Sequence, residues 1–274
     1  MDIPISELRS LYAETIKEYN TSKLAVAGKY VAVASEPKFQ ELVECVKYLP
    51  SRNATFLDIG TGMGIAPRFF LKLGCNSISI DNYVTGGNAL RNAMEAGVTG
   101  INCDIMNSAL PIEDESVDCV LFADVIEHLI HSPKFPLAEF GRVLKVGGVC
   151  VATTPNAMRL SVRLRVLLGY SNWPYIGDYF DASYHEGHHH EYTIDEFKYV
   201  FVKAQFEIAQ FILTGTVASV NIGSLGALQT RRRSGISQDA HTHPLISLAK
   251  VPIYLLERLF PVLRPEMILV ARKI

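Results

Sequence analysis

The sequence lacks the features that mark secreted and membrane-spanning proteins. Its N-terminal residues do not combine a basic start with an apolar core, so no secretory signal peptide is expected. No run of about 18 uncharged apolar residues occurs, so no transmembrane helix is expected. The five cysteines form no CxxC pair and are scattered through apolar stretches. Together these absences predict a cytoplasmic protein with reduced, buried thiols.

The chain also lacks an excess of charge of one sign. It has 26 Lys and Arg residues against 28 Asp and Glu residues, a formal net charge of −2. No overall electrostatic attraction to nucleic acid is therefore expected. Hydrophobic residues make up 49% of the 274, which suits a chain that buries a sizeable core. This length and composition favour one α/β domain with insertions.

Short apolar runs alternate with helical patterns along most of the chain. Runs of strand type occupy residues 54–59, 77–80, 98–102, 117–123, 149–154, 206–213 and 267–271. Patterns of helical spacing occupy residues 5–19, 37–49, 69–73, 87–96, 133–144 and 193–201. This alternation predicts an α/β fold with a mostly parallel, seven-stranded, Rossmann-like sheet and helices on both faces.

A glycine-rich segment directly follows the first predicted strand. Residues 58–64 read DIGTGMG, and a helical pattern comes next. Glycines let the backbone turn tightly and approach a ligand that a Cβ atom would exclude. An ordinary turn is the alternative for this motif alone. A nicotinamide dinucleotide is usually bound by GxGxxG; here the spacing is GxGxG, followed by Ile65 and Ala66, which disfavours a dinucleotide.

Acidic residues follow the next predicted strands at their carboxyl ends. Asp81 ends the second strand, Asp104 follows the third, and residues 122–128, FADVIEH, end the fourth. An acid about 20 residues beyond the glycines is placed to accept hydrogen bonds from ribose hydroxyls. Each acid alone is also compatible with capping a turn or a helix. Because ligands of open α/β sheets bind at the carboxyl ends of strands, the four segments together predict one nucleoside site.

These segments resemble consecutive motifs of class I S-adenosylmethionine (SAM)-dependent methyltransferases. The similarity covers about residues 54–156 through LDIGTGMG, SISID, NCDI, LPIEDESVDCVLFADVIEHL and LAEFGRVLKVGGVCVATTPN. It is greatest to the small-molecule branch, which includes ubiquinone-pathway and sugar or lipid methyltransferases. It continues loosely through HHHEYTIDEFKYVFVKAQFE, where Gln205 replaces the family's usual glycine. The first 50 residues and residues 155–264 have no clear counterpart.

The resemblance implies that SAM is the cofactor and that the last strand of the sheet is antiparallel. The residues that it places around SAM are Asp58, Gly60, Thr61, Gly62, Gly64, Asp81, Asn82, Asp104, Ile105, Ala123 and Asp124. The glycine loop would lie beside the methionine part, with Asp58 orienting the amino group or the loop. Asp81 would bind the ribose, Asp104 and Ile105 would bracket the adenine, and Asp124 would border the methionine end.

Histidines are the candidates for proton removal from the acceptor, because histidine is the usual base at neutral pH. We expect His128, His185 and His189 to be catalytic. The last two belong to a cluster that also contains Asp181, His188, His190 and Glu191. A polar loop that caps helices, a substrate clamp and a metal site are the alternatives for this cluster. No metal is expected, because the spacing fits no standard zinc pattern.

The resemblance and the composition together divide the chain into four parts. Residues 1–50 form an N-terminal helical cap, and residues 51–156 form the SAM-binding core. Residues 157–192 form an insertion over the active site. Residues 193–274 complete the core and contain a helical insertion at about residues 215–264.

The predicted function is transfer of a methyl group from SAM to a small molecule that is sugar-like or lipid-linked. Arg159, Arg163 and Arg165 interleave with apolar residues, and three arginines at 231–233 precede an amphipathic stretch at 245–263. Contact with a membrane or a lipid-linked substrate is one interpretation, and packing or a dimer contact is the other. Nucleic acid is not an expected partner. The rival functions are a nicotinamide-dependent oxidoreductase and a non-catalytic SAM-binding regulatory module.

Overall fold

The computed structural model describes residues 1–21, 32, 34–82, 90–169, 187–216 and 255–274. Its helices are α1 (Ile5–Thr21), α3 (Glu36–Tyr48), α4 (Ile65–Leu73), the 3₁₀ turn η1 (Ile126–His128), α6 (Lys134–Val143), α7 (Leu160–Leu167), α9 (Ile194–Lys203) and η4 (Pro261–Leu263). Its strands are β1 (Thr55–Ile59), β2 (Asn76–Asp81), β3 (Thr99–Asn102), β4 (Val117–Ala123), β5 (Leu144–Pro155), β6 (Phe206–Thr214) and β7 (Glu266–Lys273). Residues 90–95 are also helical.

The strands form one seven-stranded sheet in the order β3-β2-β1-β4-β5-β7-β6. The first five strands run parallel to one another, and β7 is antiparallel to both β5 and β6. The predicted fold class is therefore confirmed, including the antiparallel final strand. The strand order reverses between β1 and β4, and in open α/β sheets ligands bind at the carboxyl ends of the strands at such a point.

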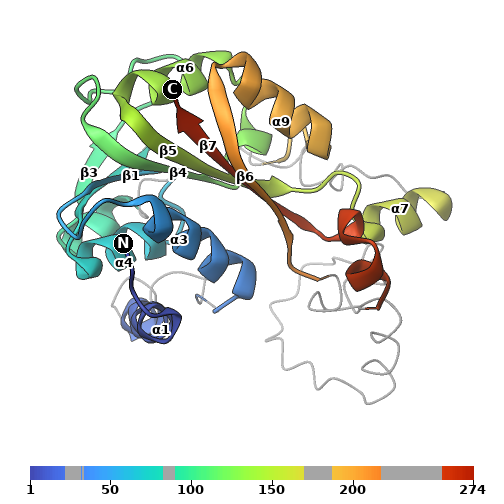
Figure 1. Cartoon of the computed structure of the whole chain (residues 1–274), viewed down its shortest axis with the longest axis horizontal. Helices are drawn as coiled ribbons and strands as arrows, with labels where there is room; N and C mark the ends of the chain where they lie inside the picture. The colour runs from blue at the N-terminus through green and yellow to red at the C-terminus, as the bar shows by residue number, and fades with distance from the viewer. Residues whose placement is uncertain (22–31, 33, 83–89, 170–186, 217–254) are drawn as a thin grey trace, which may run out of the picture.

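Helices cover both faces of the sheet (Figure 1). On β4, Cys119 and Leu121 face a core shared with α1, α3 and α4, whereas Val120 and Phe122 face the core under α6 and α9. This two-residue alternation between two apolar faces is typical of a strand buried on both sides. All five cysteines are free and buried, as the sequence predicts. No helix among the described residues is long and apolar enough to cross a membrane.

Two helices begin at capping residues that can be recognised in the sequence. The Ser35 hydroxyl accepts a hydrogen bond from the Lys38 backbone N–H at 3.4 Å at the start of α3. Thr193 and Glu196 form a reciprocal capping box at the start of α9. Both starts lie where the sequence predicts them, because the capping side chains satisfy backbone donors that the first turn leaves open.

Strand β5 differs from its predicted bounds. It begins at Leu144, directly after α6, and not at Val149. Its register against β4 shifts between the pair Val117–Leu144 and the pair Cys119–Val149. The intervening bulge contains Gly147 with a φ of 80°, a conformation that glycine adopts without strain. The glycine pair therefore forms a bulge within the strand and does not end the helix.

Both predicted insertions fall partly outside the described residues. In the first, residues 170–186 are not described, so His185 and Asp181 lie outside the described residues. In the second, the three arginines at 231–233 and most of the amphipathic stretch also lie outside them, and residues 255–259 are helical.

Candidate cofactor and acceptor site

The loop after β1 is shaped by left-handed glycines. Gly60, Gly62 and Gly64 have φ angles of 82°, 51° and 69°, which an L side chain rarely adopts. The Gly60 N–H donates to the Ile80 carbonyl at 2.9 Å. A Cβ atom at Gly60 would collide with Cγ2 of Val125. The loop therefore lies against β2 on one side and against the segment after β4 on the other.

Asp81 ties the glycine loop to the end of β2. Its Oδ2 accepts the Thr61 N–H at 2.9 Å, and its Oδ1 accepts the Asn82 N–H at 2.7 Å. Burial raises the pKa of Asp81, and these backbone donors oppose the rise. Since a carboxylate has about four lone-pair sites, this one keeps acceptor capacity for ribose hydroxyls at the strand end.

Asp58 supports the loop from inside the sheet. Ser79 Oγ donates to its Oδ2 at 3.0 Å, and the Ser79 hydroxyl in turn lies 2.7 Å from the Thr61 hydroxyl. The Asp58 side chain is buried, and burial raises its pKa to about 8. Of the two roles expected for Asp58, this chain of hydrogen bonds favours holding the loop.

Asp104 closes a turn after β3. Its Oδ1 accepts the Met106 N–H at 3.0 Å, and its Oδ2 accepts the Asn107 side-chain amide at 2.8 Å. Its neighbour Ile105 is partly buried against the core under α6 and α9. The turn thus places a carboxylate and an apolar side chain side by side at the edge where adenine is expected.

Asp124 follows Ala123 at the end of β4 and carries a left-handed backbone with a φ of 51°. Its Oδ2 accepts from Lys38 Nζ at 2.7 Å, and its Oδ1 accepts from the Thr153 hydroxyl at 3.2 Å. Lys38 Nζ also donates to Glu41 Oε2 at 3.2 Å. The predicted site thus gains two side chains from α3.

Lys38 and Glu41 were not predicted as site residues. The Lys-x-x-Glu spacing places them on one side of α3, but the sequence does not tell which strand ends that side meets. Burial raises the pKa of Glu41 to about 7, against the lowering effect of Lys38. Burial opposes the charge on Lys38, but Glu41 and Asp124 outweigh it and raise the pKa of the ammonium group.

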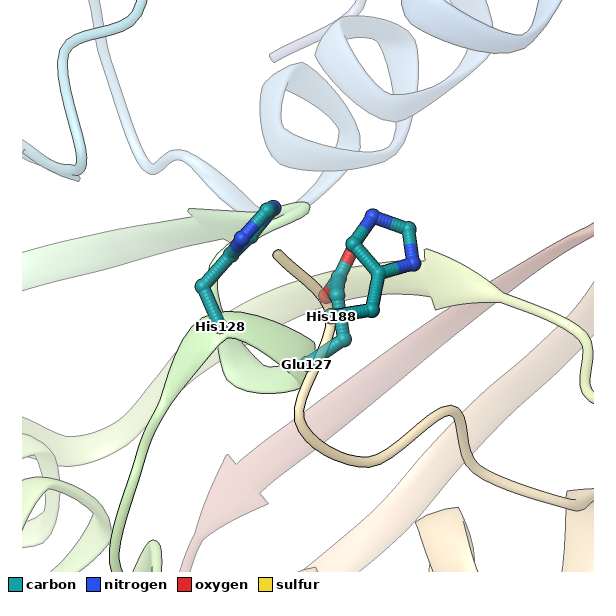
Figure 2. A group of neighbouring side chains, drawn as sticks. All are labelled: Glu127, His128 and His188. Carbon is teal, nitrogen blue, oxygen red and sulfur yellow. The ribbon is translucent and has the colours of Figure 1, made fainter. Parts of the chain in front are cut away.

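The turn after β4 meets the segment that leads into α9. The His189 backbone N–H donates to the Glu127 carbonyl at 2.7 Å, and the His128 and His188 rings lie edge to face, 4.8 Å between centroids. Figure 2 shows Glu127, His128 and His188 grouped between these two segments. The structure therefore brings together the segments that carry two of the three predicted catalytic residues, His128 and His189. The ring that contacts His128 is that of His188, a member of the histidine cluster that is not among the predicted catalytic residues.

Arg159 and Arg163 are engaged within the chain. Arg159 forms two hydrogen bonds with Glu191, at 2.5 and 3.0 Å, and Arg163 donates to the Met158 carbonyl at 2.7 Å. The bidentate pair holds Glu191 against the start of α7. Arg159 is thus a partner of Glu191 in this structure, and an anionic acceptor would have to compete with that carboxylate.

Comparison with known proteins gives a family for the core. Residues 57–152 match the family model described as a methyltransferase domain. A probable methyltransferase, PMT4 of Arabidopsis thaliana, is 30% identical over 109 residues, which is 38% of this chain and 17% of the relative. The aligned part of the chain therefore spans less than a fifth of that relative.

Solved structures give the fold of the whole chain. A SAM-dependent methyltransferase from Archaeoglobus fulgidus matches with a TM-score of 0.56 and 15% identity, covering 96% of this chain and 99% of that one. A putative sarcosine dimethylglycine methyltransferase from Galdieria sulphuraria matches with a TM-score of 0.55 and 16% identity, covering 95% and 98%. A geranyl diphosphate methyltransferase in complex with SAM has a TM-score of 0.50 and 15% identity, covering 86% and 85%.

The family match begins within β1 and ends within β5, so it contains the glycine loop and all the strand-end turns described above. The strand order, with its antiparallel β7, is the Rossmann-like order of these enzymes. Residues 57–152 therefore form a methyltransferase domain, and the chain has the fold of SAM-dependent methyltransferases.

Proposed function

We propose that this protein transfers the methyl group of SAM to a small-molecule acceptor at the carboxyl edge of its sheet. The observation that carries the proposal is the joining of the glycine loop to Asp81 through the Thr61 N–H. This contact puts a tight, glycine-rich loop beside a carboxylate at the end of the neighbouring strand. In the proposed complex the methionine part lies along the loop, Asp81 binds the ribose, and Asp104 with Ile105 borders the adenine.

The charge at this edge suits a cationic cofactor. Carboxyl groups gather around the end of β4. Burial, with added repulsion from the Asp124 carboxylate, raises the pKa of each of three to about 7: Glu41, Glu127 and Glu266. A sulfonium cation placed near them would relieve this repulsion. When SAM is bound it supplies an activated methyl group; the chain must align the acceptor with it and receive or release a proton.

The acceptor side of the site is the turn after β4. His128 remains our candidate for proton removal there, and His189 shares the segment that packs against it. His185, the third predicted catalytic residue, lies outside the described residues. The structural neighbours named for geranyl diphosphate and for sarcosine dimethylglycine act on small molecules, which supports a small acceptor.

A hydrophobic or lipid-linked acceptor is the finer proposal. Apolar side chains are exposed on α7 with its C-cap and on the short helical segment at residues 255–259, at the same end of the molecule (Figure 1). They are Leu164, Val166, Leu167, Leu168, Leu255, Leu256 and Leu259. An exposed apolar surface beside a binding edge is typical of a site for an apolar ligand.

The proposal is tested by following radiolabelled methyl groups from SAM into a lipid extract and into a water-soluble metabolite extract. We expect label in the lipid fraction with the wild-type chain and none with a Gly62→Arg variant, whose side chain fills the loop. Label only in the water-soluble fraction would overturn the lipid-linked acceptor. SAM binding without label in either fraction would favour the non-catalytic regulatory module.

A further inference from the structure

Three potential metal ligands meet where the turn after β4 contacts the segment before α9. They are Glu127, His128 and His188, and one ligand atom from each lies within 4.8 Å of the others. Figure 2 shows that the first two come from the 3₁₀ turn η1 and the third from the chain leading to α9. The two segments are held together by the hydrogen bond from the His189 N–H to the Glu127 carbonyl. The cluster is therefore a product of the fold and not of local sequence.

One oxygen of Glu127 is buried without a well-formed donor among the described residues. The side chain is fully buried, and its Oε2 accepts from the Thr154 hydroxyl at 3.0 Å. Oε1 has no well-formed hydrogen-bond partner in the described part of the chain. Burying an unpaired charged oxygen is costly, and a cation at this place would remove the cost.

His188 is oriented as metal-binding histidines are. Its Nδ1 lies 3.0 Å from Glu191 Oε1, which leaves Nε2 as the atom for a metal. Glu191 is itself fixed by the two hydrogen bonds from Arg159. A carboxylate on the far nitrogen sets the tautomer and direction of the ring and makes it a better ligand.

We propose that Glu127, His128 and His188 bind a divalent transition-metal ion. Two imidazole nitrogens and one carboxylate oxygen suit Zn²⁺, Co²⁺, Mn²⁺ or Fe²⁺ and disfavour Mg²⁺ and Ca²⁺, which take mainly oxygen ligands. In a tetrahedral site with bonds of about 2.0–2.2 Å, ligand atoms lie about 3.4 Å apart. The side chains would thus close by a little over an ångström as the ion binds. Three protein ligands leave a position open for water or an acceptor atom.

This site differs from the expectation drawn from the sequence, in which no metal was assigned. That expectation rested on the spacing of the histidines near residues 185–190 alone. Two of the three ligands come from the turn after β4, far away in the chain, so no local spacing pattern can reveal the set. The nearness of the turn to the histidine segment appears only when both are placed in the fold.

If the proposed methyl transfer is correct, the open metal position gives it a route for activating a hydroxyl acceptor. A bound cation lowers the pKa of an oxygen that it coordinates. A His128 that binds the metal cannot also accept the proton, so with the ion bound the acceptor proton passes to solvent and not to His128. The oxygen lone pair then forms the bond to the methyl carbon, and the electrons of the broken carbon–sulfur bond stay on sulfur. This step rests on the proposed function, whereas metal binding itself does not.

The test uses the untagged full chain, stripped with a chelator and titrated with Co²⁺. Visible absorption reports coordination by nitrogen and oxygen, and elemental analysis after gel filtration gives the stoichiometry. We expect one ion per chain in the wild type. The variants Glu127→Gln and His188→Ala should bind at least about tenfold more weakly. His131→Ala is the matched control, because it removes an exposed histidine close in sequence to His128, and it should bind as the wild type does.

Three results would overturn the metal site. They are no Co²⁺ binding by the folded wild type, unchanged binding in both ligand variants, and an equal loss in the His131→Ala control. Circular dichroism and a parallel SAM titration on each sample separate a folding defect from loss of the metal. His188→Ala alters the loop segment before α9, so it decides the test if Glu127→Gln fails to fold. SAM binding without Co²⁺ binding would refute the metal site alone, and the reverse would refute the proposed function alone.

Discussion

Both the backbone conformation of Gly60 and its neighbour Val125 disfavour a side chain at this position. Its φ of 82° strains any other residue, and a Cβ there would also strike Val125. We predict that Gly60→Ala lowers SAM affinity at least about tenfold, a cost of about 1.4 kcal/mol, because the loop must move away from the segment after β4. Isothermal titration with SAM measures the change.

Gly147 provides the control for this prediction. Its φ is 80°, almost the same as at Gly60, but a Cβ atom there would meet nothing within 4 Å. Gly147→Ala therefore introduces the same backbone strain without a collision and should keep SAM affinity. Equal losses in the two variants would show that strain alone matters, and that the approach of Val125 to the loop has no part in binding.

At Asp81 one side chain supports both the loop and, in our account, the ribose. We predict that Asp81→Ala weakens SAM binding by about 1–3 kcal/mol, the cost of leaving polar groups without a charged partner. The SAM affinity of Asp81→Asn should lie between those of the wild type and Asp81→Ala, because an amide keeps one acceptor oxygen. Titration of all three proteins at one salt concentration measures the effect. A difference within the error of the titration would remove Asp81 from the cofactor site.

Asp58 predicts a pH dependence of stability. Its pKa is about 8 in the folded protein against an ordinary value of 3.8, so the folded state holds the proton more tightly. The stability from this proton is fully present below about pH 4 and is lost as the pH rises through about 8. The slope is at most about 1.4 kcal/mol per pH unit for one group.

The variant Asp58→Asn has no titrating group at this position and so loses this contribution to the pH dependence of stability. Its free energy of unfolding should therefore fall less steeply between pH 5 and 8 than that of the wild type. Urea titrations at several pH values measure both slopes. Parallel curves for the two proteins would mean that Asp58 titrates in the folded protein as it does in the unfolded chain.

At the scale of elements, the capping box of α9 stabilises a helix that packs on β6 and β7. The Thr193 capping box begins the helix that buries Phe197 and Phe201 against β6 and β7. We predict that Thr193→Ala lowers the free energy of unfolding by about 1 kcal/mol, whereas Thr193→Ser, which keeps the hydroxyl, stays close to the wild type. Denaturant unfolding is the measurement. A serine variant as unstable as the alanine variant would argue against the cap.

The elements also mark the limit of prediction from sequence. The strands of the core could be predicted because each apolar run is followed by a turn signal. The starts of α3 and α9 could be predicted because Ser35 and Thr193 are typical capping residues. The start of β5 could not be predicted, because the glycines of the bulge around Gly147 resemble those that end a helix. Nor could the contribution of Lys38, since periodicity gives one side of α3 but not the strand ends that it meets.

The choice among the histidines shows the same limit. His188, His189 and His190 are consecutive, so the sequence offers no period that separates a ligand from its neighbours. The hydrogen bond between the His188 ring and Glu191, and the nearness of His128, separate them only in the fold. Candidate site residues at regular strand ends can thus be proposed from pattern, whereas those on irregular segments need the structure.

For the molecule as a whole, the site is assembled from segments spread over most of the chain. The glycine loop, the turns after β2, β3 and β4, the α3 side chains and the segment before α9 meet at one edge of the sheet. The antiparallel β7 adds Glu266 to that edge, paired with Pro155 of β5. The fold therefore concentrates acidic groups at one edge of a chain whose net charge is only −2.

The central claim is that this edge holds the adenosyl group of SAM, and a crystal structure with the product S-adenosylhomocysteine tests it most directly. We predict the methionine part along Gly60–Gly64, the ribose hydroxyls on the Asp81 carboxylate and the adenine beside Asp104 and Ile105. A nucleoside bound elsewhere on the chain, or one whose ribose makes no contact with Asp81, would contradict the account.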